Sequence, residues 1–133
     1  MNQDTGTYKP PESRDELLRR YASGERKFPD TDLSECDLSG AKLDVASFEK
    51  HSWFFNANFD GASLQRTVFR ECNVKCASFR NADLSGASFE LAAIESIDLD
   101  AAKLVGTTFI GATFYGYTIE IEGEFPPPRG LAD

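Results

Sequence analysis

The sequence has few of the residues on which catalytic and metal sites depend. It contains one histidine, His51, and it lacks a Ser/His/Asp set, a glycine-rich phosphate loop and a carboxylate pair beside a base. Cys72 and Cys76 could form half of a metal site, but no second ligand pair accompanies them. We therefore expect a protein that is not an enzyme and that binds no metal or cofactor.

Long apolar segments are also absent. The sequence has no run of about twenty apolar residues, which argues against a membrane-spanning helix, and no basic and apolar regions of a secretory signal at its N-terminus. The 22 acidic and 14 basic residues give a net charge of −8, which disfavours direct binding to nucleic acids or anionic membranes. We expect one cytoplasmic, monomeric domain.

What the chain does have is a repeat of five residues. A small residue stands two positions before a large apolar residue, here called a centre, and the centres recur in steps of five from Phe28 to Ile119. One step, from Phe48 to Phe54, is six residues long. A period of five matches neither a helix nor a strand, and it fits short segments separated by turns.

Every fourth centre forms a ladder, which predicts a solenoid with four segments per coil. The extra residue between Glu49 and Ser52 should be a local bulge that leaves the stack intact. We expect an interior without polar residues, in which Cys36 and Cys72 fill the small inward position as free thiols. Two of the ladders are uniform: Phe28, Phe48, Phe69, Phe89 and Phe109, and Leu43, Leu64, Leu84 and Leu104.

These repeats resemble the pentapeptide repeat family, whose consensus is Ala-(Asp/Asn)-Leu-x-x. The resemblance covers residues 28 to about 121 and implies an all-β fold, a right-handed quadrilateral β-helix of about 4.6 coils. Known members of the family include DNA-mimicking inhibitors of DNA gyrase, and many members have no assigned role. The best matches are AKLDV at 41–45, ANFDG at 57–61, ADLSG at 82–86 and ASFEL at 87–91.

Three other segments flank the β-helix predicted for residues 28–121. Residues 1–12 are predicted to be a flexible arm, and residues 122–133, with prolines at 126–128, a C-terminal cap and tail. Residues 13–27 should hold a capping α-helix that covers the open first coil. Ser13 and Glu16 form its capping box, and its apolar stripe consists of Leu17, Leu18 and Tyr21.

The surface offers a candidate binding patch. Trp53 and Phe55 flank the inward Phe54 beside the extra residue, so both rings are expected to point outward, where they could bind a protein. The alternative is that the bulge turns one ring inward, or that the rings fold over His51 and Lys50. The predicted patch consists of Trp53, Phe55, His51, Lys75 and Tyr115.

We therefore expect a protein–protein interaction or scaffold module with an unidentified protein partner. The alternative is a DNA mimic that inhibits a topoisomerase such as DNA gyrase, and the net charge of −8 favours it. A rod about 22 Å long would imitate only about six base pairs. The C-terminal FPPPRGLAD is not the dimerisation helix of the resistance-type members, and one coil is basic, with Arg66, Arg70, Lys75 and Arg80.

Overall fold

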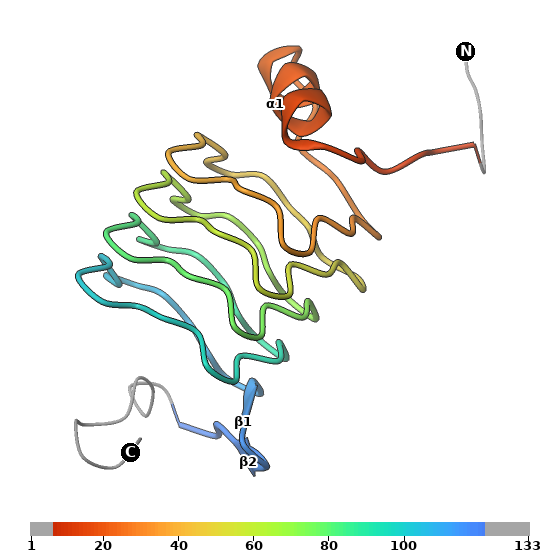
Figure 1. The fold of residues 1–133 in the computed structure, drawn as a ribbon. Coiled ribbons are helices and arrows are strands. Elements are labelled where there is room, and N and C mark those ends of the chain that lie inside the picture. The colour runs from red at the N-terminus through yellow and green to blue at the C-terminus, as the bar shows by residue number, and fades with distance from the viewer. Residues whose placement is uncertain (1–6, 122–133) are drawn as a thin grey trace.

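The computed structural model describes residues 7–121 as a stack of coils with a helix at its N-terminal end (Figure 1). Helix α1 spans Arg14–Ala22, and two short strands, β1 (Thr113–Phe114) and β2 (Tyr117–Thr118), follow the coils. The predictions for residues 1–6 and for the C-terminal cap and tail at 122–133 lie outside the described residues.

Parallel β-bridges hold the coils together. Each bridge joins two residues that directly precede centres and lie one coil apart, as in the series Lys42, Ser63, Asp83 and Lys103. Four such series run along the stack, one on each side of the coil, and the last bridge joins Ala93 to Thr113. The predicted period of five, with four segments per coil, is therefore confirmed.

A tight turn forms each corner. The carbonyl of a centre accepts a hydrogen bond from the N–H three residues later, as in the 3.1 Å bond from Ala46 N to Leu43 O. The second corner residue has a positive φ, for example 68° at Gly40 and 59° at Asn56. Type II turns require this conformation, and glycine and asparagine adopt it at low cost. The glycines of the repeat at positions such as Gly40 are thus corner residues.

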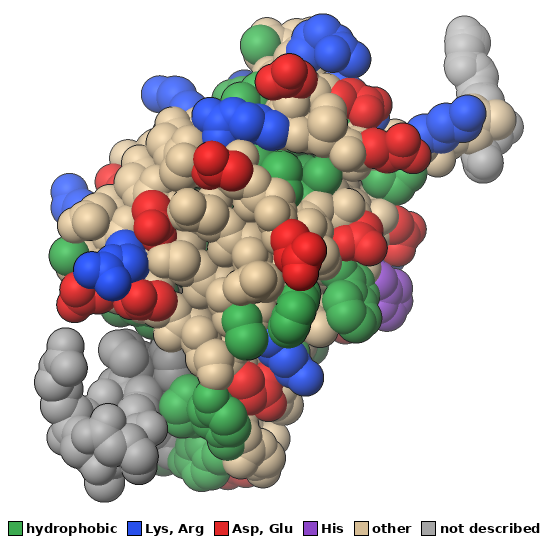
Figure 2. All heavy atoms as spheres, in the orientation of Figure 1, with side chains coloured by type: hydrophobic (Ala, Val, Ile, Leu, Met, Phe, Trp, Pro, Cys, Tyr) green, Lys and Arg blue, Asp and Glu red, His purple; other side chains and the backbone are tan. Residues whose placement is uncertain are grey.

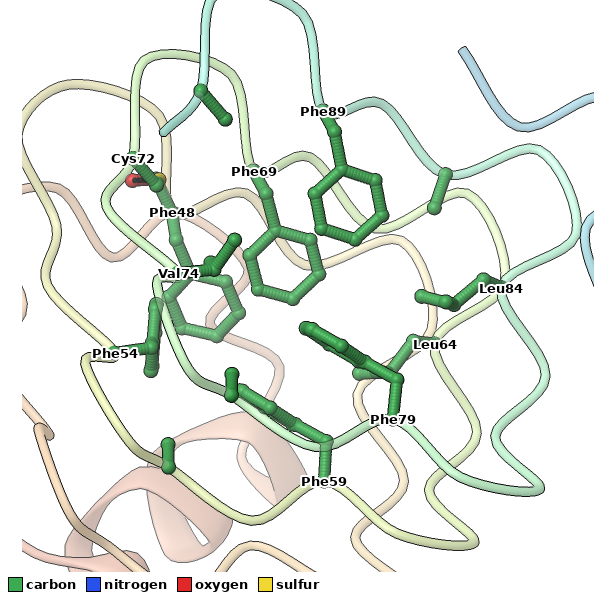
Figure 3. Packing of buried hydrophobic residues seen from close by; sticks show 14 of the residues in the cluster. Phe48, Phe54, Phe59, Leu64, Phe69, Cys72, Val74, Phe79, Leu84 and Phe89 are labelled. Atoms are coloured by element: carbon green, nitrogen blue, oxygen red, sulfur yellow. Dashed lines mark hydrogen bonds between the residues drawn. The ribbon is translucent and has the colours of Figure 1, made fainter. Parts of the chain in front are cut away.

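The centres point inward and stack on one another (Figure 3). Rings on the same side of the coil lie nearly parallel, with centroids 5.0 Å apart for Phe69 and Phe89 and 4.9 Å apart for Phe59 and Phe79. Rings on adjacent sides meet edge to face, as Phe69 and Phe79 do at 76°. Both geometries are favourable for aromatic pairs, so the ladders fill the interior and also fix the register of the coils.

The prediction of an interior without polar residues is wrong. Thr31, Ser52 and Thr67 are fully buried at the small inward position. There the hydroxyl faces a carbonyl of a centre: Thr67 Oγ1 donates a 2.9 Å hydrogen bond to Leu43 O. Because each buried hydroxyl finds a backbone acceptor, its burial carries little penalty. The thiol of Cys72 donates in the same way to Phe48 O, and Cys36, Cys72 and Cys76 are all free.

The extra residue forms a bulge at Lys50 and His51, which both have a positive φ, of 81° and 65°. The hydrogen bond from Lys50 N to Arg70 O is stretched to 3.5 Å. The bridges on either side, from Ser47 to Val68 and from Trp53 to Asn73, are retained. The bulge therefore leaves the stack intact, as predicted.

Helix α1 lies against the first coil and begins at the predicted N-cap. Ser13 Oγ accepts from Glu16 N at 3.1 Å, whereas the Glu16 carboxylate accepts from Glu12 N instead of closing the capping box on Ser13. Leu17 is fully buried in the core. Arg14 Nη1 donates to carbonyl oxygens of the first coil, at 2.9 Å to Asp37 and 3.1 Å to Ser39.

The residues before α1 also contact the folded part of the chain. Arg20 donates a 2.9 Å hydrogen bond to Lys9 O, and its guanidinium lies 5.4 Å from the centroid of the Tyr8 ring. The Tyr8 hydroxyl donates to Lys27 O at 3.4 Å. The boundaries predicted for the arm, the helix and the repeat region stay predictions.

The regular coil ends at Thr113. The sequence register continues to centres at Phe114 and Ile119, but here the chain reverses, and β1 pairs with β2 in antiparallel fashion. The turn residues Tyr115 and Gly116 both have a positive φ, which is typical of a type I′ hairpin. Tyr117 stands where the repeat requires a small inward residue, and the hairpin instead leaves its side chain exposed.

Candidate functional site

Trp53 and Phe55 are exposed side by side on one side of the stack. Trp53 is 49% exposed and Phe55 is 40% exposed, whereas Phe54 between them is fully buried. This alternation follows from the extended backbone of the segment, in which successive side chains point to opposite faces. The bulge therefore turns neither ring inward, although the binding of a protein to these rings stays a prediction.

The two rings belong to a surface that we call the Trp53 face. The residue before each centre bridges to its counterpart in the next coil, and the first corner residue after each centre lines the same side. The Trp53 face thus contains two ladders: Asp32, Trp53, Asn73, Ala93 and Thr113, and Ser34, Phe55, Lys75, Glu95 and Tyr115.

The structure brings four of the five predicted site residues together. His51 is exposed at the bulge beside Trp53, and the half-buried Lys75 follows Phe55 on the next rung. Tyr115 is exposed but lies three rungs from Phe55, about 14 Å away at about 4.8 Å per rung. It belongs to the hairpin end of the face, where its hydroxyl shares a hydrogen bond with Ser96.

Acidic residues that are not part of the predicted patch border the aromatic pair. The segment between Phe28 and Ala41 contains Asp30, Asp32, Glu35 and Asp37 and no basic residue, and all four acids are exposed. Figure 2 shows acidic side chains directly beside the hydrophobic group next to the single histidine, which is drawn in purple. The repeat register is the sequence signal that could have found them, because it places Asp32 one coil before Trp53 on the same ladder.

Some acids of the repeat also support the corners. Asp37 Oδ1 accepts hydrogen bonds from the Ser39 hydroxyl at 2.6 Å and from Ser39 N at 3.0 Å. These bonds hold the pKa of Asp37 below its ordinary value, and bonds from Ser85 lower the pKa of Asp83 in the same way. The carboxylates of these two residues are thus part of the turn and not only a solvated surface.

The basic coil is interleaved with acids from its neighbours. Arg70 lies 3.2 Å from a carboxylate oxygen of Glu49 in the previous coil and 3.8 Å from one of Glu90 in the next. Arg80 similarly pairs with Asp98 at 3.4 Å. Exposed pairs of this kind contribute little stability each. These pairs do place acidic and basic side chains alternately along the surface of the rod.

Within residues 7–121, the thiols and the possible metal ligands show no arrangement for chemistry. Burial raises the pKa of Cys72 to about 12, so this thiol stays protonated at neutral pH. Among residues 7–121, no group of three or more His, Cys, Asp and Glu side chains could hold a metal ion. Within the same range, α1 has neither the length nor the apolarity needed to cross a membrane. A surface pocket of about 260 Å³ adjoins the bulge, lined by Lys27, Pro29, Ser47, Glu49 and Lys50.

These features define a four-sided parallel β-solenoid that carries an exposed aromatic pair on one side. A family model for pentapeptide repeats matches residues 54–90, with eight copies. This part of the chain consists of pentapeptide repeats, and proteins of the pentapeptide repeat family form right-handed quadrilateral β-helices.

Solved structures of other pentapeptide repeat proteins resemble this chain. One, from the thylakoid lumen of Arabidopsis thaliana, is 38% identical with a TM-score of 0.62, and the match covers 65% of this chain and 60% of that one. Another is HetL, a protein involved in heterocyst differentiation regulation in the cyanobacterium Nostoc sp. strain PCC 7120. It is 31% identical with a TM-score of 0.47, and the match covers 66% of this chain and 43% of HetL. The chain thus spans less than two thirds of the length of either relative.

A third structure is much more distant. QnrB1, a plasmid-mediated fluoroquinolone resistance protein, is 18% identical with a TM-score of 0.26, and the match covers 68% of this chain and 53% of that one. A likeness at this level carries no argument about function. No curated protein matches the chain.

Proposed function

We propose that this protein is a non-enzymatic interaction module that presents the Trp53 face to a protein partner. The observation that carries the proposal is the exposed pair Trp53 and Phe55 on a backbone bonded into the stack. Trp53 N donates to Thr31 O at 2.7 Å, and Trp53 O accepts from Leu33 N at 2.9 Å. Large rings held on a rigid backbone lose little conformational entropy on binding, which favours their use as anchors.

The surroundings of His51 support binding over catalysis. Within residues 7–121, no hydrogen bond links this histidine to a carboxylate, hydroxyl or thiol. A catalytic histidine is ordinarily oriented by such a partner and lies within reach of a nucleophile or of the proton that it transfers. His51 is instead placed on an exposed bulge, where it can border a protein interface.

The proposal also concerns the two ends and the length of the rod. We propose that α1 is the N-terminal cap of a rod with about 4.6 coils, the number that the repeat register gives. The contacts of Arg14 and Leu17 with the first coil support this role. The cap bonds part of the end of the first coil and so hinders end-to-end stacking, and we expect the rod to be a monomer.

A capture experiment tests the function. The native protein and the double variant Trp53→Ala/Phe55→Ala are immobilised and exposed to a lysate of the source cells. A matched control, Val45→Ala/Val105→Ala, removes exposed apolar side chains from another side of the rod. We expect the native protein and the control to retain a partner that the double variant loses. Equal capture by all three proteins would contradict the proposal.

The second candidate is a DNA mimic that inhibits DNA gyrase, and the net charge of −8 is the observation in its favour. A mimic of DNA needs a continuous acidic stripe, whereas Arg70 and Arg80 interrupt the acids on two sides of the rod. We expect no inhibition of gyrase supercoiling at low-micromolar protein. Inhibition at that concentration would favour this candidate over the interaction module.

We place the protein in the cytoplasm, where its free thiols would remain reduced. The Arabidopsis relative comes from the thylakoid lumen, so members of this family also occupy other compartments. Fractionation of the source cells followed by immunodetection tests the location. Recovery of the protein outside the cytoplasmic fraction would contradict this part of the proposal.

A further inference from the structure

The first coil has one edge with no coil before it. In later coils the residue before each centre makes both of its backbone hydrogen bonds to the preceding coil, as Trp53 does with Thr31 and Leu33. Asp32 occupies the same position one coil earlier, where there is no preceding coil. Its N–H and C=O therefore face the end of the rod.

The N-terminal segment bonds carbonyls of this edge on two other sides. Arg14 bonds the carbonyls of Asp37 and Ser39, and the Tyr21 hydroxyl bonds Asp44 O at 2.8 Å. On the Trp53 face, no hydrogen bond within residues 7–121 reaches the N–H or C=O of Asp32 or the C=O of Ser34. Unpaired backbone groups at a sheet edge are a template for another strand.

We propose that this edge and the Trp53 face together form a docking site for an extended, basic segment of a partner protein. The segment adds as a further strand over Asp32 and Ser34, so that its main chain satisfies the open backbone groups. Its cationic side chains extend along the face towards Trp53 and Phe55. The inference rests on the proposed function and specifies the class of partner.

Charge complementarity selects a basic segment. Asp30, Asp32 and Glu35 surround the open edge, and none of them forms an ion pair with a cation among the described residues. The bases nearest to this edge along the face, Lys50 and His51 at the bulge and Lys75 below Phe55, lie at its borders. An acidic segment would be repelled from the edge, whereas a basic one pairs with the three carboxylates.

The aromatic rings complete the site. A guanidinium group binds both a carboxylate and the face of a tryptophan ring. Asp32 directly precedes Trp53 on the ladder, so an arginine that reaches past Asp32 arrives at the indole. Asp32 Oδ1 already accepts from Ser34 N at 3.1 Å, which holds the carboxylate in place and leaves Oδ2 for the cation.

Trp53 is the single tryptophan of the chain, so its fluorescence reports on the site directly. The probe is a peptide of about eight residues that alternates arginine and threonine, a pattern that favours an extended strand. We expect it to change the Trp53 emission and to bind more weakly as salt is added. A glutamate–threonine peptide should not bind, and an N-methylated arginine–threonine peptide, which lacks alternate backbone donors, should bind about tenfold more weakly.

Two double variants test whether binding depends on the charges at this edge or on the overall negative charge of the protein. Asp32→Asn/Glu35→Gln removes the charges at the edge and should weaken binding of the arginine–threonine peptide about tenfold. Asp98→Asn/Glu71→Gln makes the same changes elsewhere: Asp98 also precedes a centre, and Glu71 has a φ of 63° against 64° for Glu35. This control should bind as the native protein does. Circular dichroism melts establish that both variants are folded.

Several results would overturn the inference. They are absent binding of the arginine–threonine peptide, equal binding of the glutamate peptide, or equal loss in both double variants. Self-association that Trp53→Ala abolishes would also overturn it, since a second copy would then occupy the face. If a lysate protein is captured through Trp53 and Phe55 while the peptide does not bind, the inference fails and the proposed function stands.

Discussion

The hydroxyl of Tyr21 donates a 2.8 Å hydrogen bond to the carbonyl oxygen of Asp44, 23 residues further along the chain. In the next coil the equivalent carbonyl, that of Gln65, accepts instead from the backbone N–H of Val45 at 2.9 Å. A side chain of α1 therefore takes the place of a backbone donor that a preceding coil would supply. Arg14 does the same for Asp37 and Ser39, so the helix imitates part of a coil.

The first prediction concerns the side chains of α1 that take the place of backbone donors. Arg14→Ala should destabilise the protein by about 1–3 kcal/mol, because two carbonyls lose a charged donor. Amide exchange should become faster in the first coil and stay unchanged in the coil that contains Leu84. Urea unfolding and hydrogen exchange measure the two effects. Arg19→Ala, an exposed change on the same helix, is the control, and equal stability of the two variants would contradict the role given to Arg14.

The second prediction concerns pH. Hydrogen bonds from Ser39 and Ser85 lower the pKa of Asp37 and Asp83 below the ordinary value of 3.8. A carboxylate with a depressed pKa stabilises the fold above its unfolded pKa, and this stability is lost as the pH falls through the folded pKa. The melting temperature of the native protein should therefore exceed that of Asp37→Asn/Asp83→Asn near pH 6, and the gap should close towards about pH 2.

Thermal melts over this pH range provide the measurement. The asparagines keep an acceptor oxygen for the turn and remove only the titrating charge. Asp30→Asn, at an exposed corner, serves as the control for a general loss of negative charge. A gap between native protein and double variant that stays constant with pH would show that these two carboxylates do not link stability to protonation.

The repeat made the fold predictable, because two inward residues per segment encode the period directly. Phe48 and Phe69 identify the register even across the extra residue, and the structure keeps them stacked at 5.7 Å. The inward hydroxyl of Thr67 was not predicted, because its acceptor, Leu43 O, is a backbone atom from the preceding coil. The hairpin at Tyr115 was also missed, since its sequence matches the five-residue pattern until Tyr117.

The candidate site was predictable only in part. The outward position of Trp53 and Phe55 follows from alternation about Phe54, and the exposure of both rings agrees with it. The open edge at Asp32 and Ser34 could not be predicted, because it depends on where the side chains of Arg14 and Tyr21 reach. Such contacts between a helix and a coil depend on tertiary packing and leave no periodic signal in the sequence.

The third prediction concerns thiol reactivity. Cys76 is exposed at a corner, whereas Cys72 is buried and burial raises its pKa to about 12. Because the thiolate is the reactive form, a maleimide near neutral pH should label Cys76 rapidly and Cys72 only after unfolding. Mass spectrometry after timed labelling identifies the modified residue. Cys76→Ser should remove the rapid phase, and rapid labelling of Cys72 in the folded protein would contradict the inward position of the small residues.

The fourth prediction compares neighbours on opposite faces of one segment. Leu84 is fully buried between Leu64 and Leu104, so Leu84→Asp would place a carboxylate in the apolar interior. An unpaired buried carboxyl group costs several kcal/mol, which is comparable with the net stability of about 5–15 kcal/mol that a small domain possesses. We expect this variant to lose its cooperative melt. Asp83→Asn keeps an acceptor for the 3.0 Å bond from Ser85 N and loses only the charge, so it should melt cooperatively and only slightly below the native temperature.

Two further variants make this comparison decisive. Asp83→Ala removes the acceptor for Ser85 N and for the Gln65 amide, so it should lower the free energy of unfolding by about 1 kcal/mol. Its stability should therefore lie between those of Leu84→Asp and Asp83→Asn. Leu33→Asp makes the same change as Leu84→Asp in the first coil, where it should fray one end and leave later coils folded, because each coil contacts only its neighbours. Circular dichroism melts rank the four variants. A native-like melt for Leu84→Asp would mean that the centres do not point inward, and the outward position of Trp53 and Phe55 would then fail with them.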